Sequence, residues 1–154
     1  MKTLVVAASL LLASVCVDAA FVPSLPYAEF FRRADLVVIG RPVSSRETDE
    51  RWVLRTVKPA TPVVGVTTEF QALLVFKGPK QKRFKLHHMQ EQRHRGPDEL
   101  VAGVPVGISF DIPKNRRYLM FLVRERDGRF APIGEQQYAR DTSIQEVTGT
   151  TDDF

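Results

Sequence analysis

Cysteine is almost absent from this chain, because Cys16 is the only one among its 154 residues. It lies in an N-terminal apolar segment that we expect to be removed, which would leave the mature chain without a thiol. This composition excludes disulfide bonds, a cysteine nucleophile, a CxxC redox pair and any thiolate metal site in the mature protein. The stability of the fold must therefore come from the packing of its core.

The N-terminal segment has the three parts of a secretory signal peptide. Lys2 supplies positive charge, residues 4–17 are apolar apart from two serines, and residues 17–19 (VDA) place small residues where signal peptidase requires them. We predict cleavage after Ala19 and a secreted or periplasmic mature protein.

Two other roles for this segment are not favoured by its sequence. As a helix, residues 4–17 would span roughly 21 Å, which is short of a hydrocarbon core of roughly 30 Å, so a retained membrane anchor is not expected. Lipid attachment at Cys16 is disfavoured because the branched Val15 stands directly before it. No transmembrane span is predicted in the mature form.

Long amphipathic helical patterns, repeats and low-complexity tracts are also missing, which excludes helix bundles and repeat proteins. Only residues 27–34 are typical of a helix, of one or two turns, with Phe30 and Phe31 directed inward. Residues 20–154 are expected to form one domain with a single core. Residues 149–154 are expected to be a frayed tail.

Most of the remaining sequence predicts β-strands, from apolar alternation, β-branched residues and turn signals. Gly78-Pro79 and Asp127-Gly128 are typical of hairpin turns. The predicted fold is therefore all-β, a five- to six-stranded OB-like barrel with a short N-terminal helix, and a sandwich is the alternative. The candidate strands are residues 35–43, 52–57, 67–76, 83–89, 104–112, 117–125, 129–133 and 143–147, separated among others by a polar loop over 44–51 and a proline-containing connection over 58–65.

Four blocks carry a family likeness: residues 34–41 (ADLVVIGR), 68–78 (TEFQALLVFKG), 118–123 (YLMFLV) and 127–130 (DGRF). Their order resembles that of the OB-fold domains of the netrin-module and tissue-inhibitor-of-metalloproteinase family, and more closely that of uncharacterised exported bacterial proteins on the same plan. The resemblance covers most of residues 28–147. It implies an OB fold and, as one possible activity, metalloprotease inhibition.

Inhibitors of that family begin with a cysteine whose amine and carbonyl grip the protease zinc. Cleavage after Ala19 would start this chain at Ala20-Phe21. The resemblance therefore favours the family's fold over its inhibitory mechanism.

The strongest charge feature is residues 77–95, called here the basic segment, in which seven basic residues accompany one acidic residue, Glu91. The whole chain has a net charge of only +4, so this excess is concentrated in one hairpin. A solvated rim that discourages edge-to-edge pairing is one interpretation, and a surface for an anionic partner is the other. The candidate binding residues are Lys77, Lys80, Lys82, Arg83, Lys85, Arg93 and Arg95.

Specific nucleic-acid binding is not expected, because single-strand binders add exposed aromatic stacking platforms. The aromatics of the basic segment's hairpin, Phe76 and Phe84, are both predicted to point inward. An anionic lipid head group, a polysaccharide or an acidic protein of the cell envelope is the expected kind of partner.

A metal site is not predicted either. His87 and His88 are neighbours on a predicted strand and should point to opposite faces, and His94 follows across a loop. They are interpreted as surface histidines. Trp52 and Tyr118 are expected in the core because apolar residues surround both.

No arrangement of nucleophile and base or of paired carboxylates is evident. The acids Glu47, Asp49 and Glu50 share one segment with Arg46 and Arg51, which indicates a self-neutralising loop. No catalytic residue or cofactor is assigned.

These observations predict a non-catalytic, exported binding module that engages an anionic partner through the basic segment. A metalloprotease inhibitor of the netrin-module type is the first alternative. A small hydrolase or a metal site on the same scaffold is the second.

Overall fold

The computed structural model describes residues 26–56, 60–92, 107–133 and 143–148. The predicted signal peptide and the predicted C-terminal tail lie outside them. One short helix is followed by six strands and one 3-10 turn. The elements are α1 (Tyr27–Arg33), β1 (Leu36–Leu54), β2 (Thr61–Lys77), β3 (Arg83–Glu91), η1 (Ile112–Lys114), β4 (Arg117–Arg124), β5 (Phe130–Pro132) and β6 (Ile144–Val147).

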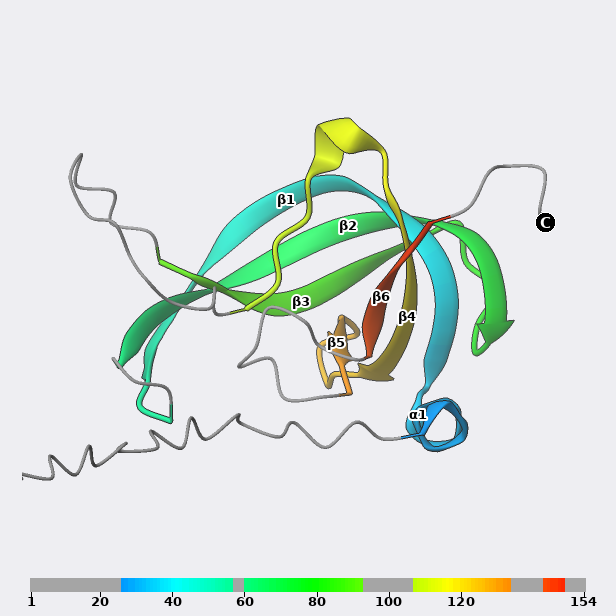
Figure 1. Ribbon diagram of the computed structural model, residues 1–154, viewed down its shortest axis with the longest axis horizontal. Coiled ribbons are helices and arrows are strands. Elements are labelled where there is room, and N and C mark those ends of the chain that lie inside the picture. The colour runs from blue at the N-terminus through cyan, green and yellow to red at the C-terminus, as the bar shows by residue number, and fades with distance from the viewer. Residues whose placement is uncertain (1–25, 57–59, 93–106, 134–142, 149–154) are drawn as a thin grey trace, which may run out of the picture.

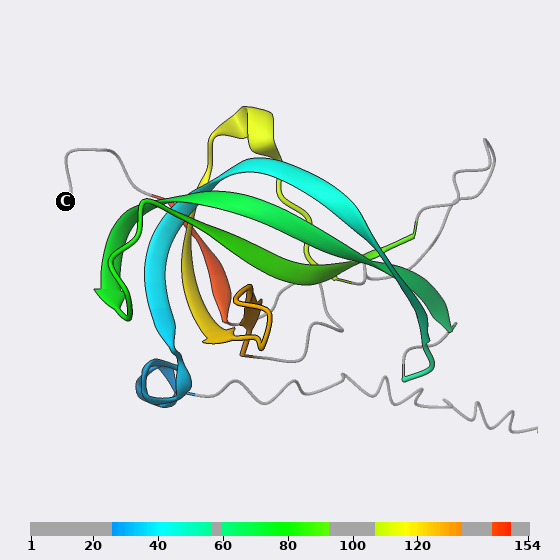
Figure 2. The same ribbon diagram turned by 180° about the vertical axis from the view of Figure 1, so that it is seen from behind.

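Five of the strands close into a ring, which Figures 1 and 2 show from opposite sides. β1 pairs with β2, β2 with β3, β3 with β5 and β5 with β4, and β4 returns to β1, while β6 is added to β4 outside the ring. All pairings are antiparallel except that of β3 with β5, which rests on the single register pair Leu86↔Phe130. The predicted all-β fold with one short N-terminal helix is confirmed.

The interior of the ring is filled by apolar side chains from every strand of the ring. Phe70 is fully buried and lies at the centre of an aromatic group, stacked on Phe84 at 5.4 Å between centroids and edge-on to Phe110 at 5.0 Å. Tyr118 packs edge-on to both Phe70 and Phe110, which confirms its predicted place in the core.

The helix α1 covers a second apolar cluster on β1 and β4, formed by Phe30, Ala34, Val37 and Phe121. The prediction that Phe31 also points inward was wrong, because its side chain is 43% exposed. Successive helical residues are rotated by about 100°, so this short helix cannot bury both neighbouring phenylalanines against the same face.

Residues 44–57 depart furthest from the predicted structure. Instead of a polar loop followed by a returning strand, β1 continues without a break to Leu54, and β2 pairs with it from Thr61 onward. Pairing with β2 continues on both sides of the bulge between Glu47 and Arg51, so main-chain hydrogen bonds hold this segment as a strand although its side chains are polar. Trp52 lies on this extension and is 37% exposed, so its predicted place in the core was wrong.

The strand predicted over residues 104–112 was wrong in its described part. Gly107 forms only an isolated bridge with Gln90 and has a positive φ of 84°, and Ile112 begins the 3-10 turn. Glycine at positive φ and Pro113 inside the turn prevent a regular ladder here.

Candidate functional site

A groove lies between strands β1 to β3 and the turn that joins β4 to β5. It encloses about 960 Å³. Its lining combines four cations with two carboxylates and five uncharged polar side chains, above two phenylalanines. The residues are Arg46, Arg83, Lys85 and Arg129, then Glu69 and Asp127, then Ser44, Ser45, Thr48, Thr67 and Gln81, with Phe84, Phe130 and Gly128.

Strand register brings these side chains together from three segments. Thr67 of β2 is paired with Arg46 of β1 on one side and His87 of β3 on the other. Two residues further along β2, on the same face of the sheet as Thr67, Glu69 is paired with Lys85 of β3. Side chains of directly paired residues lie on the same face of a sheet, so these polar side chains form neighbouring rows.

The four cations of the groove are not equally available. Arg83 contacts the Glu69 carboxylate at 3.2 Å, and Arg129 belongs to the cluster described next. Arg46 and Lys85 are exposed, and neither has a carboxylate partner among the described residues. In the part of the chain that the structure describes, Arg46 and Lys85 are thus the groove cations without a carboxylate partner, and we call them the free cations.

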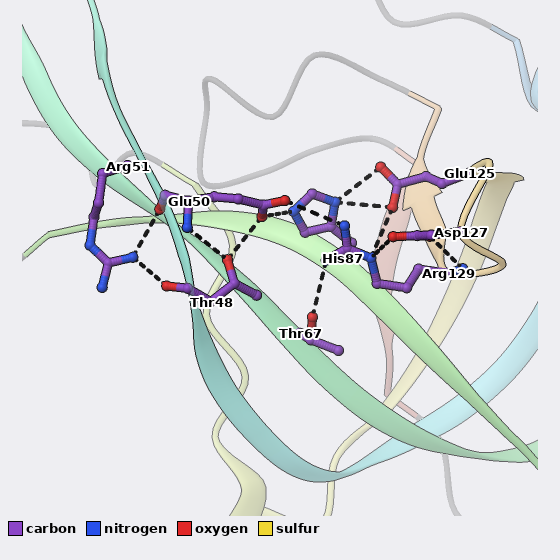
Figure 3. Close-up of polar contacts among 8 residues, drawn as sticks. All are labelled: Thr48, Glu50, Arg51, Thr67, His87, Glu125, Asp127 and Arg129. Atoms are coloured by element: carbon purple, nitrogen blue, oxygen red, sulfur yellow. Dashed lines mark hydrogen bonds and ion pairs between the residues drawn. The ribbon is translucent and has the colours of Figure 1, made fainter.

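Beside the groove, His87 lies between two carboxylates (Figure 3). Its Nε2 is 2.7 Å from Glu50 Oε2, and its Nδ1 is 3.0 Å from Glu125 Oε1. Arg129 donates to Glu50 Oε1 at 3.4 Å and to Asp127 Oδ2 at 2.6 Å. We call Glu50, His87, Glu125 and Arg129 the histidine cluster. It spans the seam between β3 and β5, where the ladder has only one register pair.

The local structure of β1 explains how Glu50 reaches His87, two strands away. The register of β1 on β2 shifts between Glu47 and Arg51, which marks a bulge, and bulges redirect side chains. The Glu50 side chain passes over β2 at Gly65. A Cβ at this position would stand 2.3 Å from Glu50 Oε2 and 2.5 Å from Thr48 Oγ1. The missing side chain of Gly65 therefore leaves the space in which the Glu50 carboxylate lies.

The electrostatics of the cluster favour an ionised Glu50. The hydrogen bond from the Thr48 hydroxyl, at 2.9 Å, is the main cause that lowers the pKa of the Glu50 carboxyl, and His87 and Arg129 lower it further. A lowered pKa means that the contribution of this carboxylate to stability is present above its ordinary value and is lost as the pH falls.

We expect Gly65→Ala to separate Glu50 from His87. The added methyl group cannot share the space with the Glu50 and Thr48 side chains, and the expected loss in free energy of unfolding is about 1 kcal/mol, the lower end for overpacking because Glu50 can swing to solvent. Urea unfolding measures the loss. In a Thr48→Ala, Glu50→Ala background the same substitution should cost clearly less, and an equal cost in both backgrounds would show that the clash lies elsewhere.

The arrangement is poorly suited to acid–base catalysis. Both ring nitrogens of His87 contact carboxylate oxygens, at 2.7 and 3.0 Å, so neither is left for a substrate. A hydroxyl–imidazole pair does occur, because Thr68 Oγ1 lies 2.8 Å from His88 Nε2. Thr68 is fully buried and His88 is 2% exposed, so no substrate can reach that pair.

The structure divides the predicted basic segment. Arg83 and Lys85 line the groove. Lys80 and Lys82 are exposed at the turn between β2 and β3. Lys77 faces α1, where its Nζ donates to the carbonyls of Phe31 and Arg32 at 2.8 and 3.1 Å. Arg93 and Arg95 lie outside the described residues.

His87 and His88 lie in different environments. His87 and His88 point to opposite faces, as expected, but the interpretation of His88 as a surface residue was wrong. His88 packs edge-on against Phe110 at 5.2 Å in the core, and burial lowers its pKa to about 4. His94 lies outside the described residues.

Sequence reasoning missed Arg46, Glu50 and Arg129. The first two were assigned to a self-neutralising loop. Arg46 instead has no carboxylate partner among the described residues, and the Glu50 side chain extends over β2 to His87. Two signals pointed toward this site: Gly65 inside a β-branched run, since glycine in a strand often marks a close approach, and the Asp127-Gly128 turn, which holds Arg129 next to the sheet.

Across residues 26–56, 60–92, 107–133 and 143–148, no group of three or more histidine, cysteine or carboxylate side chains is placed to hold a metal ion. No helix in the same residues is long and apolar enough to cross a membrane. No known protein family model matches the chain, and no curated protein matches it significantly.

Proposed function

We propose that this protein is a non-catalytic binding module, exported in its mature form, that engages an anionic partner through the groove and the adjoining turn between β2 and β3. The observation that carries the proposal is the pair of free cations in the groove, Arg46 and Lys85. They face a space lined by hydroxyl and amide groups, a combination suited to a ligand with both negative charge and hydrogen-bonding oxygens.

The composition of the groove favours some anions over others. Its two phenylalanines, Phe84 and Phe130, are 5% and 3% exposed, so they offer no face for base stacking. The hydroxyls of Ser44 and Thr67 can donate to sugar hydroxyls or to carboxylates. An acidic polysaccharide or an acidic protein surface of the cell envelope is therefore preferred over nucleic acid.

The absence of catalysis is part of the same proposal. Two observations support the absence of catalysis. Both ring nitrogens of His87 contact carboxylates, and the Thr68–His88 pair is buried. Metalloprotease inhibition in the manner of the netrin module would depend on residues 20–23, which lie outside the described residues, and no contact among the described residues favours it.

Replacing both free cations, as Arg46→Gln with Lys85→Gln, should weaken binding to a heparin fragment or to poly-glutamate by about tenfold at low salt. That factor assumes somewhat less than 1 kcal/mol for each exposed charge contact. The dependence of affinity on salt concentration should become shallower as well. Isothermal titration calorimetry at several salt concentrations measures both effects.

The matched control is Arg33→Gln with Arg124→Gln. Both arginines are exposed and lie outside the groove, so this variant changes the net charge equally. It should bind the probes almost as the wild type does. An equal loss in the two double variants would mean that only net charge matters, which contradicts a site in the groove.

A further inference from the structure

Four large apolar side chains are exposed where the C-terminal end of β2 lies next to α1. Leu73 and Leu74 are each 44% exposed, Phe76 is 51% exposed, and Phe31 of α1 is 43% exposed. We call these four side chains the apolar patch. Exposed apolar groups that are gathered in one place and bordered by polar residues are typical of an interaction surface.

Strand register places part of the apolar patch on the outer face of the sheet, beside the helix. Val37 packs beneath α1, and Ile39 follows two residues later on the same face of β1. Their register partners on β2 are Lys77 and Leu74, and directly paired side chains share a face. Lys77 reaches α1, since its Nζ lies 5.5 Å from the centroid of the Phe31 ring. β2 and α1 therefore contribute to one surface.

The main chain beside the apolar patch is closed to a further strand. From Lys77, residues 78–82 turn back along the edge of β2 (Figures 1 and 2), and the N–H of Ala72 donates to the carbonyl of Lys82 at 2.9 Å. The surface offered at this end of β2 thus consists of side chains. A partner that requires no pairing with main-chain groups fits it best.

The charge around the apolar patch is positive. Residues 73–83 (LLVFKGPKQKR) contain four basic residues and no acidic residue. Lys80 and Lys82 are exposed and have no carboxylate partner among the described residues. This end of the molecule is therefore complementary to a surface that combines apolar groups with negative charge.

We propose that the apolar patch and the turn between β2 and β3 dock on a lipid surface that carries anionic head groups. The apolar side chains enter the boundary between head groups and acyl chains, while Lys80 and Lys82 contact the lipid phosphates. The aliphatic stems of the lysines allow their ammonium groups to stay at the phosphates as the apolar side chains enter more deeply. No residue of the apolar patch lines the groove, so this inference goes beyond the function proposed above and shares only the turn with it.

Two other occupants fit this surface less well. Protein interfaces are depleted in lysine, whereas each lysine near an anionic membrane strengthens binding. Contact between the same surfaces of two copies would place Lys77, Lys80 and Lys82 of both chains close together, and such like-charge contacts oppose association. An anionic lipid surface accommodates the apolar and the basic side chains at once.

Tryptophan fluorescence of the full chain tests which part of the protein meets the lipid. The probe is Phe76→Trp in a Trp52→Phe background, and the vesicles contain phosphatidylglycerol and a brominated phosphatidylcholine. We expect the emission from position 76 to shift to the blue and to be quenched. Because the readout is local, contact made by the apolar N-terminal segment does not produce it.

The wild type supplies the control for this measurement. Trp52 is its only tryptophan and lies on the extension of β1, near the end of that strand remote from α1. Its emission should stay unchanged when the same vesicles are added.

Two double variants, both made in the Phe76→Trp, Trp52→Phe background, test the charges. Lys80→Gln with Lys82→Gln should raise the lipid concentration for half-maximal quenching by about thirtyfold. Arg55→Gln with Arg126→Gln is the matched control, because both arginines are exposed and lie outside the groove and the apolar patch. It should change that concentration by about threefold or less. Vesicles of phosphatidylcholine alone should quench only weakly.

A third comparison tests the apolar contact. In the same background, Leu74→Ser should raise the lipid concentration for half-maximal quenching by about fivefold, since a partly exposed leucine no longer enters the lipid. Val53→Ser is the matched control, because Val53 is 51% exposed near the remote end of β1, and it should have no effect. Circular dichroism confirms that each variant is folded.

Three results would overturn the proposal: no quenching at position 76, equal quenching of Trp52, or an equal loss in the two charge variants. Dimerisation that is lost on Leu74→Ser would assign the apolar patch to a second copy instead. Binding of poly-glutamate that is lost in the same variant would assign it to an acidic protein. Heparin binding in Arg46→Gln with Lys85→Gln tests the groove separately, so failure of one proposal is distinguished from failure of the other.

Discussion

Lowering the pH from 7 to 5 is expected to reduce the free energy of unfolding by about 2 kcal/mol through His88 alone. Burial lowers the pKa of this histidine from 6.5 to about 4. Between these values the unfolded chain binds a proton that the folded chain excludes, so acid favours unfolding. The contribution is fully present above pH 6.5 and is lost as the pH falls toward 4. Urea unfolding followed by circular dichroism at pH 7, 6 and 5 measures the slope.

A glutamine in place of His88 removes the titrating group. His88→Gln should be less stable than the wild type at pH 7, because it loses the ring packed against Phe110, but its stability should fall less steeply between pH 7 and 5. The comparison is repeated in a His87→Gln background, which removes the neighbouring histidine on the opposite face. The same flattening in both backgrounds is expected. An unchanged slope after His88→Gln would refute a neutral, buried His88.

The carboxyls of Glu50 and Asp127 do not obscure this window. The pKa of Glu50 lies below its usual 4.5, and that of Asp127 lies below its usual 3.8, mainly because the backbone N–H of Arg129 donates to it. Both groups therefore stay ionised as the pH falls from 7 to 5, and the stability that they contribute is lost only at lower pH.

The burial of His88 could be predicted only in part, and β3 shows why. Its alternation places Phe84, Leu86 and His88 on one face, and all three are buried. Strict alternation holds because β3 keeps a regular register with β2 from Arg83 to Glu91. The pattern gave the correct face for His88, but its polar side chain suggested the surface. Burial depended on Thr68 from β2, which supplies the hydrogen-bond partner.

The course of β1 was harder to predict. Residues 44–51 (SSRETDER) have the composition of a loop, and intrinsic strand preference is weak compared with cross-strand pairing. What makes them a strand is β2, whose residues Thr61–Val66 lie alongside. The pairing is a property of the whole ring, and no local pattern in either segment encodes it.

The candidate site also depends on closure of the ring. Arg83 and Lys85 were predicted because they belong to one charged hairpin, and the structure places both in the groove. Arg46 comes from β1 and Arg129 from the turn after β4, so only closure of the ring brings them together. Lys77 and Lys85 are equivalent in the sequence pattern, but Lys77 donates to main-chain carbonyls of α1 and does not reach the groove. Charge density along the chain thus identifies the right region but not the residues that remain free.

Phe70→Ala should destabilise the fold by about 4 kcal/mol, whereas Phe76→Ala should change stability by less than about 0.5 kcal/mol. The two phenylalanines stand on one strand and were predicted to share its inner face. Phe70 is fully buried among Phe84, Phe110 and Tyr118, so its removal leaves a cavity that these rings cannot refill. One register shift, at Leu73, lies between Phe70 and Phe76 and reverses the alternation, and Phe76 itself stands at a second shift. Phe76 is therefore 51% exposed, and the prediction that it points inward was wrong.

Urea unfolding at pH 7 compares the two variants. If Phe70→Ala does not fold, Phe70→Leu keeps most of the volume and should still cost about 1 to 2 kcal/mol. Equal losses at positions 70 and 76 would mean that alternation continues unbroken along β2 and that Phe76 lies in the core. This pair of variants therefore tests the register shifts of β2 directly.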